Sequence, residues 1–285
     1  MAAYAAGGHD VHVLTCTLGE EGEVIPPALA HLGSDRDDTL GAWRREELRS
    51  AMSVLGVAHS VLGVGSELGL ASRYRDSGMA GTPSAEHPDA FAQADPVEAV
   101  ALVAAHIRDL RPDVVVTYDA LGGYGHPDHI QTHRTTMAAL AALAEAGDTS
   151  MPVVYCILTA QSWAMQDRVW LRDNVVVEGD VTSRRSRCLV LDRDAPYPPS
   201  VVSDETVTYI VEDHALVDIQ SRALGQHATQ VSVFDGYYAL SNRIAVRLSG
   251  REGFAQFDPL RGELVPSAPG APRHTDLLTG RQDRG

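Results

Sequence analysis

Residues 122–129 concentrate side chains that can bind a metal ion or transfer a proton. They supply two imidazoles, a carboxylate and a phenol, on Tyr124, His126, Asp128 and His129. The segment follows an apolar run at 114–118 and opens a long amphipathic stretch. A corner between a strand and a helix is where α/β enzymes commonly carry out their chemistry. The residue types and their spacing therefore predict a catalytic or metal-binding site at this corner.

Each of these side chains has a chemical role open to it. His126 and His129 are three positions apart and share one face of a helix, so one could bind zinc while the other transfers protons near neutral pH. Asp128 could orient an imidazole. Tyr124 lies between glycines, and its hydroxyl could reach a developing oxyanion. The alternative is an ordinary helix start with Asp128 at the positive end of the helix dipole, but that leaves both histidines unexplained.

Three other segments carry polar side chains that could contact a ligand. They are the acidic loop 18–23 with Glu23, the helix expected at 38–55 with Arg44, and the polar loop 73–79 with Asp76 and Met79. Each has an ordinary structural explanation as well. An acidic loop or an arginine on a helix can simply face solvent, and a polar loop can cap a turn.

The composition limits both the partners and the chemistry. The 285 residues can bury a real core, and the formal net charge of −15 argues against nucleic acids and anionic membranes as partners. A neutral or cationic small molecule is easier to reconcile with that charge. All 23 basic residues are arginine, which excludes a lysine nucleophile or Schiff base. Three cysteines, an odd number, indicate reduced thiols and a cytoplasmic protein, and we expect no membrane span.

Strands and helices are expected to alternate along the first half of the chain. The patterns predict helices at 1–6, 38–55, 96–110 and 126–146 and strands at 11–17, 58–62, 114–118 and 152–159. Such alternation predicts an α/β fold with a Rossmann-like, doubly wound and mainly parallel sheet. The expected parts are a core at 1–161, a smaller α+β portion at 162–265 and a disordered tail at 266–285. The ligand should lie beyond the carboxyl ends of the strands, where the loops after Thr17, Leu62 and Tyr118 meet.

The chain resembles the LmbE-like, PIG-L-type zinc N-deacetylases over most of its length. The resemblance rests on five segments: TCTLGEEGEV at 15–24, RDSGMAGT at 75–82, VTYD at 116–119, GGYGHPDH at 122–129 and HATQ at 227–230. The first two are similar to the branch that removes acetate from N-acetylglucosaminyl-inositol in mycothiol biosynthesis. The resemblance therefore implies a small-molecule amino-sugar-inositol substrate. Two alternatives stay open: a mycothiol-conjugate amidase, and a non-catalytic relic or sugar-binding protein.

The family pattern implies a role for each matching position. His129 resembles a ligand of the single Zn²⁺ ion of an intact subunit. His126 resembles the protonated imidazole that stabilises the oxyanion and assists the leaving amine, with Asp128 as its partner. Tyr124 resembles a mobile phenol that polarises the carbonyl. Four positions match residues that contact the sugar or the inositol: Glu23, Arg44, Asp76 and Met79.

One part of the family pattern is absent from this sequence. The family carries two further zinc ligands and its general base in an Ala-His-Pro-Asp-Asp-Glu motif after the first strand, and neither that strand nor that motif is present. Either the start codon is assigned too late and they are encoded upstream of Met1, or the gene has lost them. A lone histidine does not hold catalytic zinc, which normally needs three protein ligands. The chain by itself is therefore expected to be poorly stable, with an unpaired strand edge, and inactive.

Overall fold

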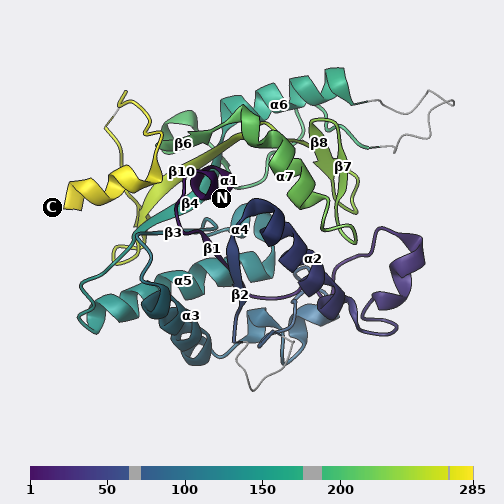
Figure 1. Ribbon diagram of the computed structural model, residues 1–285, viewed down its shortest axis with the longest axis horizontal. Coiled ribbons are helices and arrows are strands. Elements are labelled where there is room, and N and C mark those ends of the chain that lie inside the picture. Colours follow the sequence, from purple (N-terminus) through teal and green to yellow (C-terminus); the bar gives the residue numbers. More distant parts are fainter. Residues whose placement is uncertain (64–71, 176–187, 269, 285) are drawn as a thin grey trace. The chain divides into compact units, whose positions relative to one another are not determined.

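The computed structural model describes residues 1–63, 72–175, 188–268 and 270–284 (Figure 1). The chain divides into two compact units, each built from three segments. Unit 1 comprises Met1–Ser60, Ser162–Pro196 and Asp213–Arg251, and unit 2 comprises Val61–Gln161, Tyr197–Glu212 and Glu252–Gly285. Each unit carries its own β-structure.

Unit 1 contains a two-stranded and a three-stranded sheet. The first pairs β1 (His12–Thr15) with β2 (Ala58–Val61), and the second joins β7 (Ser232–Phe234), β8 (Tyr237–Ala239) and β9 (Ala245–Arg247) in antiparallel order. The helical elements are α1 (Ala2–Ala6), α2 (Leu40–Leu55), α6 (Gln161–Asn174), α7 (Val217–Leu224), η1 (Pro27–Leu32) and η5 (His214–Leu216). Helix α2 ends at Gly56, which takes the left-handed conformation that glycine tolerates best.

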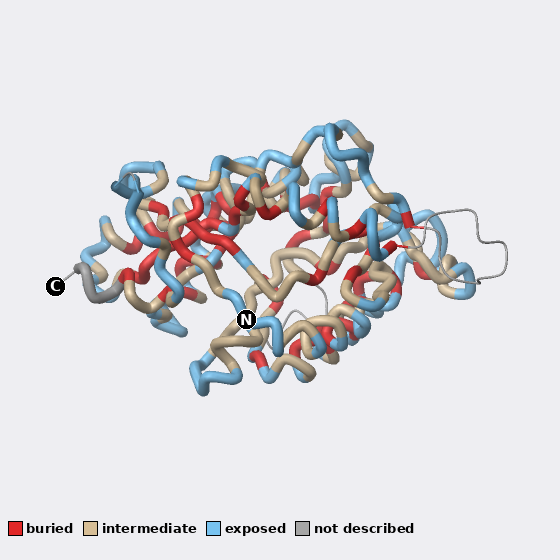
Figure 2. Tube along the Cα trace, turned by 90° about the horizontal axis from the view of Figure 1, so that it is seen from above, coloured by how far each residue is buried: buried red, intermediate tan, exposed pale blue. Residues whose placement is uncertain are grey.

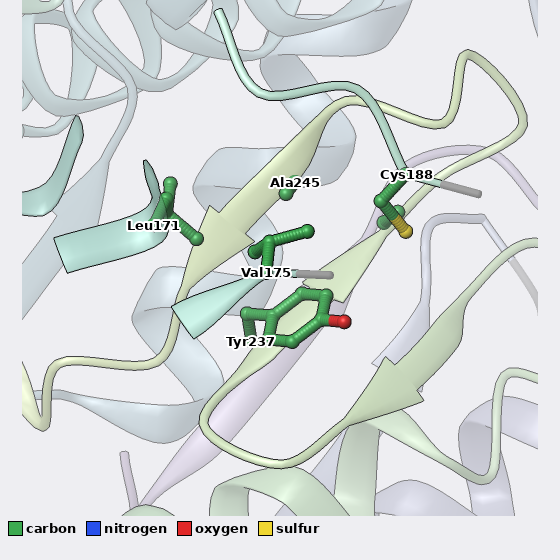
Figure 3. Packing of buried hydrophobic residues seen from close by; sticks show 6 residues of the cluster. Leu171, Val175, Cys188, Tyr237 and Ala245 are labelled. Carbon is green, nitrogen blue, oxygen red and sulfur yellow. The ribbon is translucent and has the colours of Figure 1, made fainter. Parts of the chain in front are cut away.

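A hydrophobic cluster joins the end of α6 to the three-stranded sheet of unit 1. It consists of Leu171, Val175, Cys188, Tyr237, Ala239 and Ala245 (Figure 3). Trp170, Val190 and Phe234 pack against it. Burial of apolar surface stabilises such a cluster by roughly 25 cal/mol per Å² removed from water, so the cluster ties two segments that are distant in sequence.

Unit 2 is organised around a six-stranded mixed sheet. Its strands are β3 (Val114–Thr117), β4 (Val153–Ala160), β5 (Val201–Val202), β6 (Tyr209–Glu212), β10 (Arg251–Asp258) and β11 (Glu263–Leu264). The strand order is β11-β10-β4-β3, while β5 pairs with β4 and β6 with β10. The pairs β3-β4 and β4-β5 are parallel, whereas β10 is antiparallel to both β4 and β11.

Two long helices of unit 2 pack against each other, α3 (Pro96–Leu110) and α5 (Pro127–Glu145). Each has a proline in its first turn, and at the start of α3 the carboxylate of Asp95 accepts the amide of Val97 at 2.8 Å. The remaining elements are α4 (Gly122–Gly125), η2 (Pro83–Glu86), η3 (Phe91–Gln93), η4 (Asp204–Thr206) and η6 (Leu277–Arg284). Within the described ranges, no helix combines the length and the apolar character needed to span a bilayer.

Strand β4 is buried along most of its length, whereas β3 has an open edge; Figure 2 maps burial along the chain. The apolar run of β4 is typical of a strand covered on both faces. Among the residues that the structure describes, β3 is hydrogen-bonded to β4 alone, and its Val116 is 40% exposed. An exposed apolar strand edge is a site where further β-structure can pair.

The structure confirms the α/β class. Helices α2, α3 and α5 and strands β3 and β4 lie within a few residues of their predicted ranges. A single doubly wound sheet stays a prediction, because β1 and β2 form a sheet of their own and β10 enters beside β4 in the antiparallel direction.

The C-terminal segment differs from the disordered tail that its composition predicts. Leu277 is buried, and its carbonyl oxygen accepts the hydroxyl of the buried Tyr155 at 2.7 Å. The guanidinium of Arg273 donates to the carbonyl oxygens of Val207 and Asp204. These contacts with other segments of unit 2 give the C-terminal segment an ordered place, which a count of proline and glycine does not reveal.

Candidate active site

The candidate site begins where β3 ends, in unit 2. The carboxylate of Asp119 accepts the amides of Leu121 and Gly123 at 2.7 and 2.9 Å and turns the chain into α4. Gly122 has a φ of 64°, and a Cβ there would lie 2.7 Å from the amide nitrogen of Ile130. Glycine is therefore required for α4 to fold against the first turn of α5.

One ring nitrogen of His129, Nε2, can bind a metal ion. Its Nδ1 lies 3.1 Å from the carbonyl oxygen of Gly122, and because a carbonyl only accepts, Nδ1 carries the proton. The lone pair is then on Nε2, the atom that can bind a metal. Burial, and after it the neighbouring His126, lowers the pKa of His129 to about 4, so the ring is neutral at pH 7. The ring of Tyr118 stacks on it with centroids 4.1 Å apart and fixes its plane.

His126 has the opposite tautomer. It is the N-cap of α5, and its Nδ1 accepts the amide of Asp128 at 3.2 Å. The proton of the neutral ring is therefore on Nε2, which lies 4.0 Å from Oδ1 of Asp76. Burial lowers the pKa of His126, and the negative charge of Asp76 opposes that effect. The ring centroids of His126 and His129 are 4.9 Å apart.

Tyr124 keeps its phenol protonated beside these rings. Its ring meets that of His129 edge-on, with 5.1 Å between centroids. Burial raises the pKa of Tyr124, and the charges of Asp76 and Asp128 raise it further. The residue is still 53% exposed and is flanked by glycines with positive φ. Its hydroxyl can therefore turn toward a bound carbonyl group and donate a hydrogen bond.

Two buried carboxylates, Asp76 and Asp128, complete the group. The carboxylate of Asp128, which the sequence predicts as the partner of His126, accepts the amide of Ser77 at 3.2 Å. The carboxylate that lies near the Nε2 of His126 belongs to Asp76, for which the sequence predicts a contact with substrate. Met79, in the same loop as Asp76, is 50% exposed.

The donors in the described residues do not complete a metal centre. Across 1–63, 72–175, 188–268 and 270–284, no group of three or more His, Cys, Asp or Glu side chains is placed to hold a metal ion. A catalytic zinc normally has three protein ligands. His129 has the tautomer and the neutral ring that a metal ligand requires.

Arg44 and Glu23, the other two predicted site residues, belong to unit 1. The buried guanidinium of Arg44 donates from Nη1 to the carbonyl oxygen of Gly19 and from Nη2 to that of Glu23. A Cβ at Gly19 or at Gly22 would collide with this guanidinium, so the loop encloses it. Arg44 therefore shapes the loop that carries Glu23.

A buried network holds the same arginine from its other side. Its Nε donates to Oγ1 of Thr229 at 3.2 Å, and the hydroxyl and amide of Thr229 donate to the carboxylate of Glu47 at 2.7 and 2.9 Å. Glu47 and Thr229 are not among the site residues that the sequence predicts. The signal was present, since Arg44 and Glu47 are three positions apart on α2 and Thr229 lies in the HATQ segment.

Glu23 also lines a pocket of unit 1 with a volume of about 310 Å³. Ser232, Phe234 and Arg243 contribute to the same wall. Polar and apolar side chains both line this pocket, and none of the histidines of unit 2 contributes to it.

The sequence of the chain matches one enzyme family. Residues 1–140 match the family described as PIG-L: GlcNAc-PI de-N-acetylase. Together with the relatives that follow, this match shows that the chain belongs to the PIG-L family of de-N-acetylases.

Two bacterial relatives share much of the sequence. A 1D-myo-inositol 2-acetamido-2-deoxy-alpha-D-glucopyranoside deacetylase from Streptomyces scabiei (strain 87.22) is 42% identical over 290 residues, covering 98% of this chain and 83% of that protein. A protein of the same name from Thermobifida fusca (strain YX) is 44% identical over 266 residues, covering 92% and 88%. A crystal structure of a deacetylase-teicoplanin complex covers 90% of this chain and 91% of its own, but at a TM-score of 0.44 and 16% identity it adds no structural argument.

Proposed function

We propose that this protein hydrolyses the N-acetyl group of N-acetylglucosaminyl-inositol, a step of mycothiol biosynthesis. The activity named for relatives that are 42% and 44% identical over nearly the whole chain supports this substrate. The observation that carries the chemistry is the group of Tyr124, His126 and His129 at one corner, with centroid distances of 4.9–6.1 Å. A small neutral sugar also suits a protein with a net charge of −15.

Amide hydrolysis makes three demands on the site. Water must add to the carbonyl carbon, the oxyanion must be stabilised, and the leaving nitrogen must gain a proton. The protonated phenol of Tyr124 donates to the oxyanion. The Nε2–H of His126 donates a hydrogen bond to the departing amine, and the proton that this amine gains is the one that the attacking water loses, so the neutral ring keeps its own proton. The products are acetate and a glucosaminyl-inositol with a free amino group.

Zinc is the cofactor expected of the family, and we assign His129 as one ligand of a single ion. A bound zinc would activate the water and polarise the carbonyl. The described residues do not provide the remaining ligands, so the further donors would come from outside them. The roles proposed for Tyr124 and His126 rest on the positions of these two side chains and do not depend on the identity of the other zinc ligands.

We also propose that the protein works in a reducing, cytoplasmic environment. Cys16, Cys156 and Cys188 form no disulfide. Burial raises the pKa of Cys156 to about 12, so its thiol is inert at neutral pH.

The test is hydrolysis by the complete gene product. Purified protein is incubated with N-acetylglucosaminyl-inositol and zinc, and the acetate and free amine released are quantified. A mycothiol thiol adduct is added as a competing substrate, and its cleavage is measured in the same way. Equal amounts of acetate and amine from the sugar, with slower cleavage of the adduct, are expected. Faster cleavage of the adduct would assign an amidase instead, and failure to cleave either would refute the proposal.

A further inference from the structure

We propose that Asp76 is the carboxylate whose charge acts on the Nε2–H of His126, and that Asp128 is a positioning residue that holds the loop of Asp76 against the start of α5. This inference rests on the proposed function, because it assigns the two carboxylates around the imidazole that serves the leaving amine. It assigns to Asp76 the role of partner to His126 that the sequence predicts for Asp128, and it gives Asp128 a positioning role instead.

The tautomer of His126 selects its partner. Its Nδ1 is occupied by the main-chain amide of Asp128, so the connection between these two residues runs through the backbone. The N–H of the ring is on Nε2, and Oδ1 of Asp76 lies 4.0 Å from that atom. Both side chains are largely buried, where a charge acts over such a distance more strongly than in water. A gap of 4.0 Å is too long for a hydrogen bond, and it leaves Nε2 able to reach a substrate nitrogen.

The carboxylate of Asp128 is directed to a different partner. Its Oδ2 accepts the amide of Ser77 at 3.2 Å, and Ser77 is completely buried. A carboxylate that accepts a buried amide holds it more firmly than a neutral acceptor does. Asp128 thus fastens the first turn of α5 to the residue that follows Asp76 in the chain.

Ser77 fixes the loop on its other side as well. Its Oγ accepts the amide of Ala92, within η3, at 2.9 Å. The carboxylate of Asp76 in turn accepts the amide of Gly78 at 3.0 Å, which sets its direction within the loop. Asp128, Ser77 and Asp76 therefore form a continuous path from α5 to the Nε2 of His126.

The experiment uses three variants of the complete gene product and a matched control. Asp128→Asn keeps an oxygen that can accept the Ser77 amide, Asp128→Ala removes it, and Asp76→Asn removes the charge near His126. The control is Asp95→Ala, which deletes another bond from a carboxylate to a backbone amide in unit 2, at the start of α3. Hydrogen exchange of the Ser77 amide and the separate kcat and KM for acetate release are measured in each.

We expect Asp128→Ala to speed exchange at Ser77 about tenfold or more, while Asp128→Asn retains both the protection and most of kcat. Asp76→Asn should keep Ser77 protected and lower kcat more than it changes KM. Asp95→Ala should leave Ser77 exchange and kcat unchanged. The inference is overturned if Asp128→Asn loses kcat as strongly as Asp128→Ala while Ser77 stays protected in both.

One measurement on the unsubstituted protein guards against variants that do not fold. Long-range proton-nitrogen spectra of the imidazoles report which ring nitrogen carries the proton, and they should show His126 protonated on Nε2. Protonation on Nδ1 would overturn the assignment. These spectra and the exchange data do not depend on turnover, so absence of acetate release would reject the proposed function alone.

Discussion

The imidazole of His129 donates its Nδ1 proton to the carbonyl oxygen of Gly122 across 3.1 Å. The turn before α5 thereby determines which nitrogen of the metal-binding candidate bears the lone pair. The same glycine lies so close to α5 that a Cβ would be 2.8 Å from the Cβ of His129. Backbone geometry and ligand geometry are thus linked at one residue.

Replacing Gly122 by alanine should destabilise the protein more than the positive φ of this residue alone explains. Gly147 offers a matched control, because its φ of 81° is also positive but a Cβ there meets nothing within 4 Å. A left-handed alanine costs about 1–2 kcal/mol. We expect Gly147→Ala to cost that amount and Gly122→Ala at least about 1 kcal/mol more, measured by urea denaturation. Equal losses would show that the close approach to α5 is not a constraint.

Removing the hydroxyl of Tyr124 should impair catalysis and spare the fold. The residue is half exposed, so Tyr124→Phe is expected to leave the free energy of unfolding within about 0.5 kcal/mol. Loss of one donor to an oxyanion typically lowers kcat by about 10²-fold to 10³-fold. Steady-state kinetics of acetate release test this, with Tyr4→Phe in α1 as the control that keeps full kcat. An unchanged kcat in Tyr124→Phe would remove the phenol from the mechanism.

Acid should weaken the fold through His129. Its pKa of about 4 in the folded protein is below the ordinary value of 6.5, so the unfolded chain binds this proton more readily. This contribution to stability is fully present above about pH 6.5 and is lost as the pH falls toward about 4. Metal-free protein should therefore lose unfolding free energy over that range, and His129→Gln should lose less. The same acid sensitivity in both proteins would contradict the buried, neutral imidazole.

Replacing Arg44 by lysine tests whether this residue has a structural role or contacts the substrate. Lysine cannot reproduce three hydrogen bonds that leave a planar guanidinium in different directions. We expect Arg44→Lys to destabilise the protein by about 2–3 kcal/mol. The exposed Arg49, paired with Glu46, is the control and should tolerate lysine within about 0.5 kcal/mol. Unchanged stability with a raised KM in Arg44→Lys would instead support the substrate contact that the sequence predicts.

The sequence predicts the long elements and the corner, because these depend on local signals. Pro96 and Pro127 mark helix starts, the valines of β3 mark a strand, and the spacing of His126 and His129 marks the site. Contacts between distant segments were not predictable. Ser77 reaches Asp128 across 51 positions and Thr229 reaches Glu47 across 182, and no pattern within either segment encodes such a pairing. These two contacts change the roles assigned to Asp76, Asp128 and Arg44.

The mechanism depends on His129 as a zinc ligand of the proposed N-deacetylase. The most direct measurement is zinc content together with acetate release for the complete gene product and for its His129→Ala variant. We predict about one zinc and steady hydrolysis of N-acetylglucosaminyl-inositol in the first, and loss of both in the variant while its fold is retained. A folded His129→Ala protein that keeps its zinc and releases acetate at the same rate would contradict the account.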